Sequence, residues 1–197
     1  MASTILVDKI DPQSGTALEL GSSGDTLTVP SGATLSIASG ATLANSGTAT
    51  GIGGSNTPYF YAFRSGNQTG VSSSTWTTVI NNSEVVDSEN SYNTSTGQWT
   101  PSVAGYYQIN TMITAIPDSD VTQLMIAIKA SSHSDPRYAN FLKLGSANIN
   151  RFSGAVSGIV YLNGSQTVES RVYIVGQGGS LQGEVQYTNF SGYRIIT

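Results

Sequence analysis

Cysteine is absent from this chain of 197 residues, and histidine occurs only once. The protein can therefore form neither disulfides nor thiolate metal sites, and its single imidazole leaves at most one histidine general base. Charged residues make up 10% of the chain, against about 25% in a typical domain. Because 8 basic residues are outnumbered by 12 acidic ones, the chain is unsuited to neutralising a row of phosphates. We therefore expect no nucleic-acid partner.

Long hydrophobic runs are also missing. No segment approaches the ~18 apolar residues of a transmembrane helix. Ala2, Ser3 and Thr4 follow Met1 where a secretory signal would have a basic and then an apolar region. We therefore expect no membrane insertion and synthesis in a cytoplasm.

Aromatic residues are absent until Tyr59, and all of them lie from there onward. The earlier part is instead rich in Ser, Thr and Gly, and it ends in a flexible Gly-rich linker at residues 51–56. This composition predicts an N-terminal anchoring unit over residues 1–25, a repeat stalk with its linker over 26–54, and a head over 55–197. Strands over 4–10 and 17–20, separated by a turn, would make the first unit a small hairpin.

An eight-residue repeat begins at residue 26. It reads Thr-Leu-Thr-Val-Pro-Ser-Gly-Ala, then Thr-Leu-Ser-Ile-Ala-Ser-Gly-Ala, then a degraded third copy. Residues two apart share one face of a strand, and Ser-Gly favours a turn, so each octad predicts a short strand and a turn. The recurring apolar residues are Leu27, Val29, Leu35, Ile37 and Leu43.

A single octad has too few apolar side chains to offset the entropy of ordering its backbone, about 1–2 kcal/mol per residue. Short repeats become stable by stacking or pairing with other copies, and three chains around one axis would hide the apolar side chains at once. We therefore expect a slender trimeric stalk with the five octad side chains at the interface. A disordered linker is the alternative, although a pure linker needs no leucine at every eighth position.

Residues 58–197 alternate apolar and polar runs between turn clusters, without a sustained helical period. This pattern predicts an all-β sandwich or jelly roll. The expected strands are 59–64, 75–80, 105–116, 123–130, 140–144, 152–161, 167–175 and 184–196.

Several spaced motifs of the head resemble those of a known family. They are, in order, Tyr-Asn at 92–93, Thr-Gly-x-Trp at 96–99, Pro101, Gly-x-Tyr-x-Ile at 105–109 and Phe-Ser-Gly-Tyr at 190–193. Together they resemble the globular head of the complement-type, tumour-necrosis-factor-like superfamily. The resemblance implies a ten-stranded jelly roll that assembles as a homotrimer. Two features depart from the family: the turn at 162–166 lacks its usual acid, and octads stand in place of a collagen stalk.

The predicted strand that starts at Gly105 shows how the head would assemble. Alternation places Tyr107 and Ile109 toward the core, followed by Thr111 and Ile113, and it places Tyr106 and Met112 on the opposite face. Tyrosine and methionine on an outward strand face suit a subunit interface better than open water. We therefore expect Tyr106 and Met112 at the trimer interface.

The N-terminal segment carries a second resemblance. Ser-Thr-Ile-Leu-Val-Asp-Lys-Ile at residues 3–10, followed by Ser/Thr/Gly octads, resembles short virion fibre proteins of tailed phages. This resemblance implies an anchor that docks on a tail or capsid protein, and a virion location after synthesis in the host bacterial cytoplasm. We expect a non-enzymatic tail fibre whose trimeric head binds a host-surface ligand, a glycan or a protein. The alternative is a capsid-anchored head fibre or decoration protein with a structural role.

Loop residues supply the candidate contacts. His133, Arg137 and Tyr138 lie together in one loop, where a β scaffold commonly carries its binding residues, and we expect them to contact the ligand. Asp118 and Asp120 are candidate calcium ligands, although the full ligand spacing is not present. No Gly-x-Ser-x-Gly turn accompanies the histidine. We therefore expect no catalytic residue, and no cofactor other than calcium.

Overall fold

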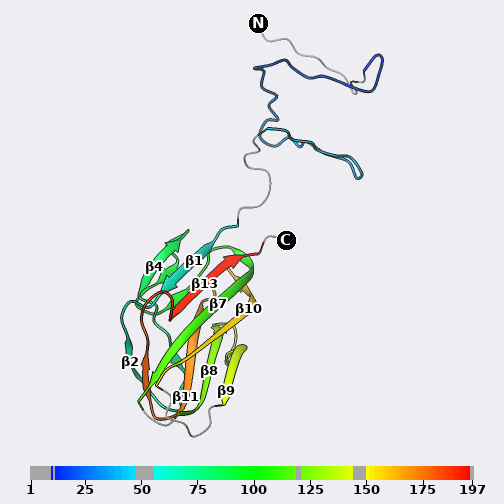
Figure 1. Ribbon diagram of the computed structural model, residues 1–197. Coiled ribbons are helices and arrows are strands. Elements are labelled where there is room, and N and C mark those ends of the chain that lie inside the picture. The colour runs from blue at the N-terminus through cyan, green and yellow to red at the C-terminus, as the bar shows by residue number, and fades with distance from the viewer. Residues whose placement is uncertain (1–9, 11, 48–55, 119–120, 144–149, 196–197) are drawn as a thin grey trace. The chain divides into compact units, whose positions relative to one another are not determined.

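The structure is a computed structural model that describes residue 10 and residues 12–47, 56–118, 121–143 and 150–195, with only the backbone of Tyr138 (Figure 1). The chain divides into two compact units, Met1–Thr50 and Gly51–Thr197. Among the described residues there is no helix, and so none long and apolar enough to cross a membrane. Every strand of the described part lies in the second unit, the head.

The head is built from strands joined by turns and loops. In chain order they are β1 (Tyr59–Phe63), β2 (Gln68–Val71), β3 (Thr77–Thr78), β4 (Ser83–Asp87), β5 (Tyr92–Asn93), β6 (Gln98–Trp99), β7 (Ala104–Pro117), β8 (Val121–Ala130), β9 (Tyr138–Lys143), β10 (Phe152–Asn163), β11 (Val168–Gly176), β12 (Gly179–Leu181) and β13 (Asn189–Arg194).

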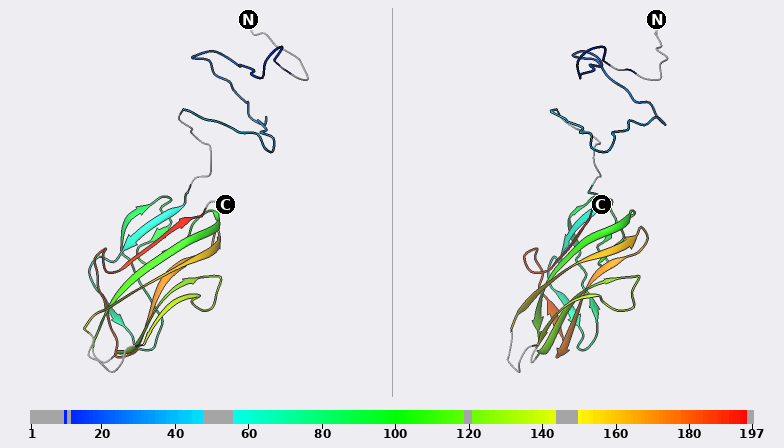
Figure 2. Two further views of the ribbon diagram at one scale, coloured as in Figure 1. Left: turned by 45° about the vertical axis from the view of Figure 1, so that its right-hand side comes forward. Right: turned by 90° about the vertical axis from the view of Figure 1, so that its right-hand side faces the viewer.

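These strands form two sheets that face each other as a jelly-roll sandwich (Figure 2). The seven-stranded sheet has the order β2-β12-β7-β13-β1-β4, and β10 pairs with the other edge of β7. The six-stranded sheet has the order β5-β6-β11-β8-β9, and β3 pairs with β11. All named strand pairs are antiparallel, and the long β7–β10 pair leaves β10 at the edge of its sheet (Figure 1).

The core contains aromatic residues from the motifs that resemble the complement-type head. Trp99 is fully buried, and its ring centroid lies 4.5 Å from Phe60 and 5.2 Å from Tyr107. The Trp99 Nε1 donates to Ser91 Oγ at 2.8 Å, which satisfies its one polar group. Phe190 stacks edge-on against Phe60 at 5.0 Å. The motif residues are therefore core residues that join the two sheets.

Strand β7 has the predicted alternation. Tyr107, Ile109 and Ile113 are each 0% exposed, whereas Tyr106 is 53% exposed. The Tyr107 hydroxyl donates to the carbonyl of Val103, so its polar end is satisfied although its ring is buried. The prediction of an outward-facing Tyr106 and an inward-facing Tyr107 is confirmed.

The all-β fold class is confirmed, and the strand list needs correction. The eight strands expected from alternation, and the ten that the resemblance implies, become thirteen within the described part of the chain. Alternation missed the short strands β2, β4, β5, β6 and β12, because two to five residues carry too little pattern. The last predicted strand began at Glu184, but the structure has a turn there, with Thr188 N donating to Glu184 O at 3.1 Å, and β13 begins at Asn189.

The first unit contains turns that recur at the octad period. Their backbone hydrogen bonds run from Asp25 N to Ser22 O, from Ala33 N to Pro30 O and from Ala41 N to Ala38 O, each at 3.0 Å. The third residue of each turn is a glycine with φ of 93°, 86° and 84°, in the left-handed region that favours glycine. The structure therefore extends the period upstream, to a turn that precedes the first complete octad.

The strand half of the octad prediction does not appear in the single chain. Residues 12–47 contain no strand, and so the predicted strand over 17–20 is absent. The other predicted N-terminal strand falls almost wholly on residues 4–9, outside the described residues. The physical reason is that a strand needs a hydrogen-bonded neighbouring strand, and one copy of this short segment does not supply one.

Candidate functional site

A cleft of about 480 Å³ opens where β8 ends and β10 approaches its last residues. Its apolar floor consists of the buried residues Ile128, Ala130 and Val160. The rest of the lining consists of Ser132, His133, Arg137, Ile159, Tyr161 and Gln166. The volume falls within the roughly 300–1,000 Å³ typical of small-molecule sites. An apolar floor with a few polar groups is also typical of such sites.

The loop between β8 and β9 is fastened at both ends. Ser131 N donates to Thr167 O at 2.8 Å, and Ser131 Oγ accepts from Thr167 N at 3.0 Å, which ties the loop to the β10–β11 turn. Arg137 N donates to Ile128 O at 3.2 Å at the other end of the loop. Side chains on a loop held in this way are presented by the rigid sandwich.

His133 is oriented by its neighbour in the sequence. Its Nδ1 lies 2.8 Å from Ser132 Oγ, and its backbone N donates to Ala130 O at 3.1 Å. Asp135 instead accepts from Ser134 Oγ at 3.2 Å. The carboxylate therefore does not hold the imidazole as it does in a Ser-His-Asp relay. The Ser132 contact makes Nε2 the ring nitrogen that is left for a ligand.

The β10–β11 turn forms without the acid that is usual at this turn in the complement-type heads that the motifs resemble. Asn163 Oδ1 accepts from the backbone N of Ser165 and of Gln166, both at 3.1 Å. In return, Gln166 Oε1 accepts from Asn163 N at 3.2 Å. An asparagine can close a turn in this way because its short side chain reaches the backbone two residues on. The pairing fixes Gln166 at the edge of the cleft.

The structure brings together two of the three predicted contact residues, His133 and Arg137, in the lining of one cleft. Tyr138 begins β9, and its side chain lies outside the described part of the structure. Sequence reasoning missed Tyr161 and Gln166, which reach the cleft from another part of the chain. A tyrosine in a strand and a glutamine in a Ser-rich turn give no local signal of a site.

A second feature of the head is a row of exposed tyrosines on the outward face of the seven-stranded sheet. Tyr59, Tyr193, Tyr106 and Tyr161 are 39%, 44%, 53% and 51% exposed. Tyr59 lies opposite Tyr193 in register, and Tyr106 lies opposite Tyr161 with their rings edge-on at 5.3 Å. We call these four residues the tyrosine face.

Met112, the other predicted interface residue of the head, projects from the same side of β7 as Tyr106 and is partly exposed. Between them, Ser157 Oγ donates to Asn110 Oδ1 at 2.8 Å and accepts from Gln108 Nε2 at 2.6 Å. The outward face thus combines aromatic rings with amides that are already hydrogen bonded to one another. In the first unit, all five octad side chains are exposed in the single chain, by 44–71%.

The predicted calcium site finds no support among the described residues. Asp118 is exposed at the end of β7, where its backbone N donates to Gly178 O at 3.0 Å. Asp120 lies outside the described residues. In the described part of the chain no group of three or more His, Cys, Asp or Glu side chains is placed to hold a metal ion.

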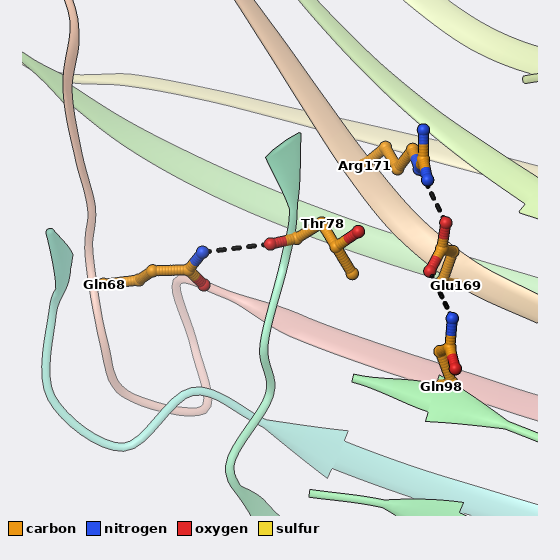
Figure 3. A network of polar contacts seen from close by, with 5 residues as sticks. All are labelled: Gln68, Thr78, Gln98, Glu169 and Arg171. Carbon is orange, nitrogen blue, oxygen red and sulfur yellow. Dashed lines mark hydrogen bonds and ion pairs between the residues drawn. The ribbon is translucent and has the colours of Figure 1, made fainter. Parts of the chain in front are cut away.

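One carboxylate of the head is buried, and its contacts make it structural. Glu169 on β11 is 6% exposed, and its Oε1 accepts from Arg171 Nε at 2.6 Å. Its Oε2 accepts from Gln98 Nε2 at 2.9 Å, which links β11 to β6 (Figure 3). In the same region Gln68 Nε2 donates to Thr78 O at 3.0 Å (Figure 3). Both oxygens of this buried charge are engaged, so removing either partner would leave part of a buried charge uncompensated.

The comparisons with known proteins bear on the fold. No protein-family model matches the sequence, and no curated protein matches it. Two crystal structures of murine APRIL, at pH 8.0 and pH 8.5, are similar with TM-scores of 0.54 and 0.51, 9% identity, and coverage of 70% of this chain and 98% of theirs. The globular domain of the zebrafish complement 1qA protein matches with a TM-score of 0.46 and 18% identity over 71% of this chain and 97% of that domain. The similarity to the two APRIL structures shows that the head shares their jelly-roll fold.

Proposed function

We propose that this chain is a non-enzymatic, homotrimeric fibre of a tailed-phage virion. Its N-terminal part docks on the particle, the octads form a stalk, and the head binds a host-surface glycan through the cleft at His133 and Arg137. The observation that carries the proposal is the tyrosine face, because it gives the head an assembly surface of the kind that the motif resemblance implies.

The tyrosine face has the chemistry of an interface. Soluble monomers rarely expose large contiguous apolar patches, and patches rimmed by polar groups usually mark interaction sites. Tyrosine is enriched at interfaces because its ring buries apolar area while its hydroxyl finds a polar partner. Tyr106 and Tyr161 come from strands β7 and β10, which pair along the whole of β10. A neighbouring subunit would therefore meet a continuous surface on one rigid sheet.

The octads supply the second support for a trimer. Their apolar side chains are exposed in one chain, and their turns repeat at a fixed interval. Three such chains around an axis would bury these side chains in successive layers and would give each strand segment a hydrogen-bonded partner. A stalk of this kind joined to a trimeric head is the arrangement of a fibre.

Trimerisation also gives the fibre its binding strength. A single open cleft with few polar groups binds one sugar unit weakly. Three clefts on one head that meet a repetitive cell surface gain avidity by factors of about 10² or more, without any new contact. A head poor in charge provides little electrostatic steering, so contact with many copies of the ligand matters more than the rate of a single encounter.

Assembly is tested by light scattering on the full chain, with a matched pair of variants. Tyr106 on the tyrosine face and Phe141 on the other sheet are 53% and 55% exposed. We expect the protein to scatter as three times the chain mass of 20.5 kDa. Tyr106→Arg should give monomers, because it places a charge in the interface, whereas Phe141→Arg should leave the trimer intact. A monomeric wild-type protein, or equal effects of both variants, would contradict the proposed assembly.

The virion role is tested by immunogold electron microscopy of phage particles that carry this protein. Gold at the tail supports a receptor-binding fibre, for which host glycans would then be screened as ligands. Gold over the capsid instead supports a capsid-anchored fibre or decoration protein with a structural role. The absence of gold from every particle would contradict a virion protein of either kind.

A further inference from the structure

We infer that the cleft at His133 and Arg137 binds a sugar unit that carries an oxyanion, a carboxylate or a phosphate, with the oxyanion at Arg137 and the sugar ring against the apolar wall. This inference rests on the proposed binding role of the head and specifies the ligand of that site. Three properties of the cleft support it: its charge, its hydrogen-bonding groups and its wall.

The charge of the cleft is opposite to that of the whole protein. The chain has a formal net charge of −4, but Arg137 and His133 line the cleft and none of its described lining residues is Asp or Glu. The carboxylate of the loop itself, Asp135, is exposed and accepts a hydrogen bond from Ser134. A local positive site on an acidic protein favours an anionic ligand group by charge complementarity.

The hydrogen-bonding groups of the cleft are mainly donors. Ser132 Oγ is engaged by His133 Nδ1, and Gln166 Oε1 already accepts from the backbone of Asn163. What remains is the guanidinium of Arg137 with its five N–H groups, the Nε2 amide of Gln166, the hydroxyl of Tyr161 and His133 Nε2, which donates or accepts according to the tautomer. A carboxylate or phosphate only accepts hydrogen bonds, and the planar fork of arginine matches two of its oxygens.

The wall of the cleft suits the apolar face of a sugar ring. Ile159 and Tyr161 are both 51% exposed on β10, and Val160 between them is buried. The Tyr161 ring is held edge-on by Tyr106, so it offers a fixed surface for stacking. A cleft of about 480 Å³ is large enough for a single sugar unit with its charged group. Tyr161 also belongs to the tyrosine face, so each cleft of the proposed trimer lies beside a subunit boundary, and the sugar would meet only the part of the ring that faces the cleft and not the neighbouring subunit.

The test measures binding of three hexoses that differ only at one carbon: glucose, glucuronic acid and glucose 6-phosphate. Each is titrated by calorimetry and by ligand-observed NMR into the full chain. We expect one or both anionic sugars to bind at least about tenfold more tightly than glucose, since the Arg137 fork can make two charge-assisted hydrogen bonds to an oxyanion and only neutral-acceptor bonds to glucose. The difference should shrink as ionic strength rises.

Matched variants assign the binding to the cleft. Arg137→Gln should reduce the affinity for the anionic sugar to that for glucose, and Arg137→Lys should retain part of it. Lys143→Gln removes the same charge from the other end of β9, outside the cleft, and should leave binding unchanged. Because the Arg137 side chain is exposed, neither substitution of Arg137 should unfold the head. The tryptophan fluorescence of each variant checks that the head is folded.

Each outcome separates the inference from the proposed function. Binding of glucuronic acid alone, of glucose 6-phosphate alone or of both supports the inference and identifies the oxyanion. Equal binding of glucose, no binding of any sugar, or equal effects of Arg137→Gln and Lys143→Gln would overturn it. Light scattering on the same samples shows whether the trimer is present, so a trimer without sugar binding refutes the ligand class while the proposed assembly stands.

Discussion

Gly97 lies in the motif that resembles the complement-type head, and replacing it with alanine tests why the motif needs a glycine. Its φ is 73°, in the left-handed region, and its backbone N donates to Asn93 O at 2.8 Å to close the turn between β5 and β6. A Cβ at this position would lie 2.5 Å from the carbonyl oxygen of Val79 and 3.1 Å from the Cα of Ile80. Both obstacles are backbone atoms, which cannot rotate away.

Gly66 provides a control with the same conformation and open surroundings. Its φ is 71°, and a Cβ there would meet nothing within 4 Å. Alanine at either position has the cost of a left-handed residue, about 1–2 kcal/mol, partly offset by the lower entropy of the unfolded chain, roughly 0.4–1 kcal/mol. Only Gly97→Ala adds a clash, worth about 1–3 kcal/mol or more. We therefore expect Gly97→Ala to destabilise the head by at least about 1 kcal/mol more than Gly66→Ala.

The assay is unfolding by urea, followed by tryptophan fluorescence. Both tryptophans lie in the head, and the fully buried Trp99 reports on its core. The measurements are made at one protein concentration, since the stability of an oligomer depends on it. If the two variants lose equal free energy of unfolding, the contact with Val79 does not explain the glycine, and the reasoning from the packed turn is refuted.

Two further predictions concern the stalk and the core. The three octad leucines are 58–71% exposed in the single chain. Replacing them with serine should lower the stability of the trimeric stalk by about 1–2 kcal/mol per buried leucine. Residues 12–47 should then become sensitive to protease. Serine in place of the threonine before each leucine is the control, and unchanged protease resistance of the leucine variant would contradict buried octads. Burial raises the pKa of Tyr92 above its ordinary 10.0, so the folded head keeps a proton that the unfolded chain loses. The free energy of unfolding should then fall as pH rises above about 10, by up to about 1.4 kcal/mol per pH unit, and Tyr92→Phe should flatten this dependence. The measurement is urea unfolding at several pH values. If the Tyr92→Phe variant loses stability as steeply as the wild-type protein, the burial of Tyr92 is not the cause.

The parts of the head that alternation could predict are its long strands. Strand β7 has fourteen residues, and its period of two is enough to place Tyr107 inside and Tyr106 outside without knowledge of its partner strands. The short strands β5 and β6 escaped prediction because each has two residues. They exist because Tyr92 pairs with Trp99 and Trp99 pairs with Val168, which are tertiary facts. Local pattern therefore predicts a strand only where the strand is long enough to show its period.

The candidate site was predictable in part for a similar reason. His133 and Arg137 are neighbours in one loop whose composition is typical of a binding loop, so the sequence could propose them together. Tyr161 and Gln166 join them only because β10 and its turn meet the β8–β9 loop through the Ser131–Thr167 hydrogen bonds. No spacing rule connects these segments, since the Ser131–Thr167 hydrogen bonds continue the β8–β11 pairing of residues far apart in the chain.

The all-β class, the inward and outward faces of the long strands and the period of the octad turns could all be inferred from the order of residues. These properties depend on residue type and short-range spacing, such as a glycine that accepts positive φ at each turn. The tertiary structure alone decided which strands are neighbours. It aligned Tyr59 with Tyr193 and Tyr106 with Tyr161 to make the tyrosine face, and it brought β10 and its following turn beside Arg137 to form the cleft. The physical reason is that strand register is set by hydrogen bonds and core packing between segments far apart in the chain.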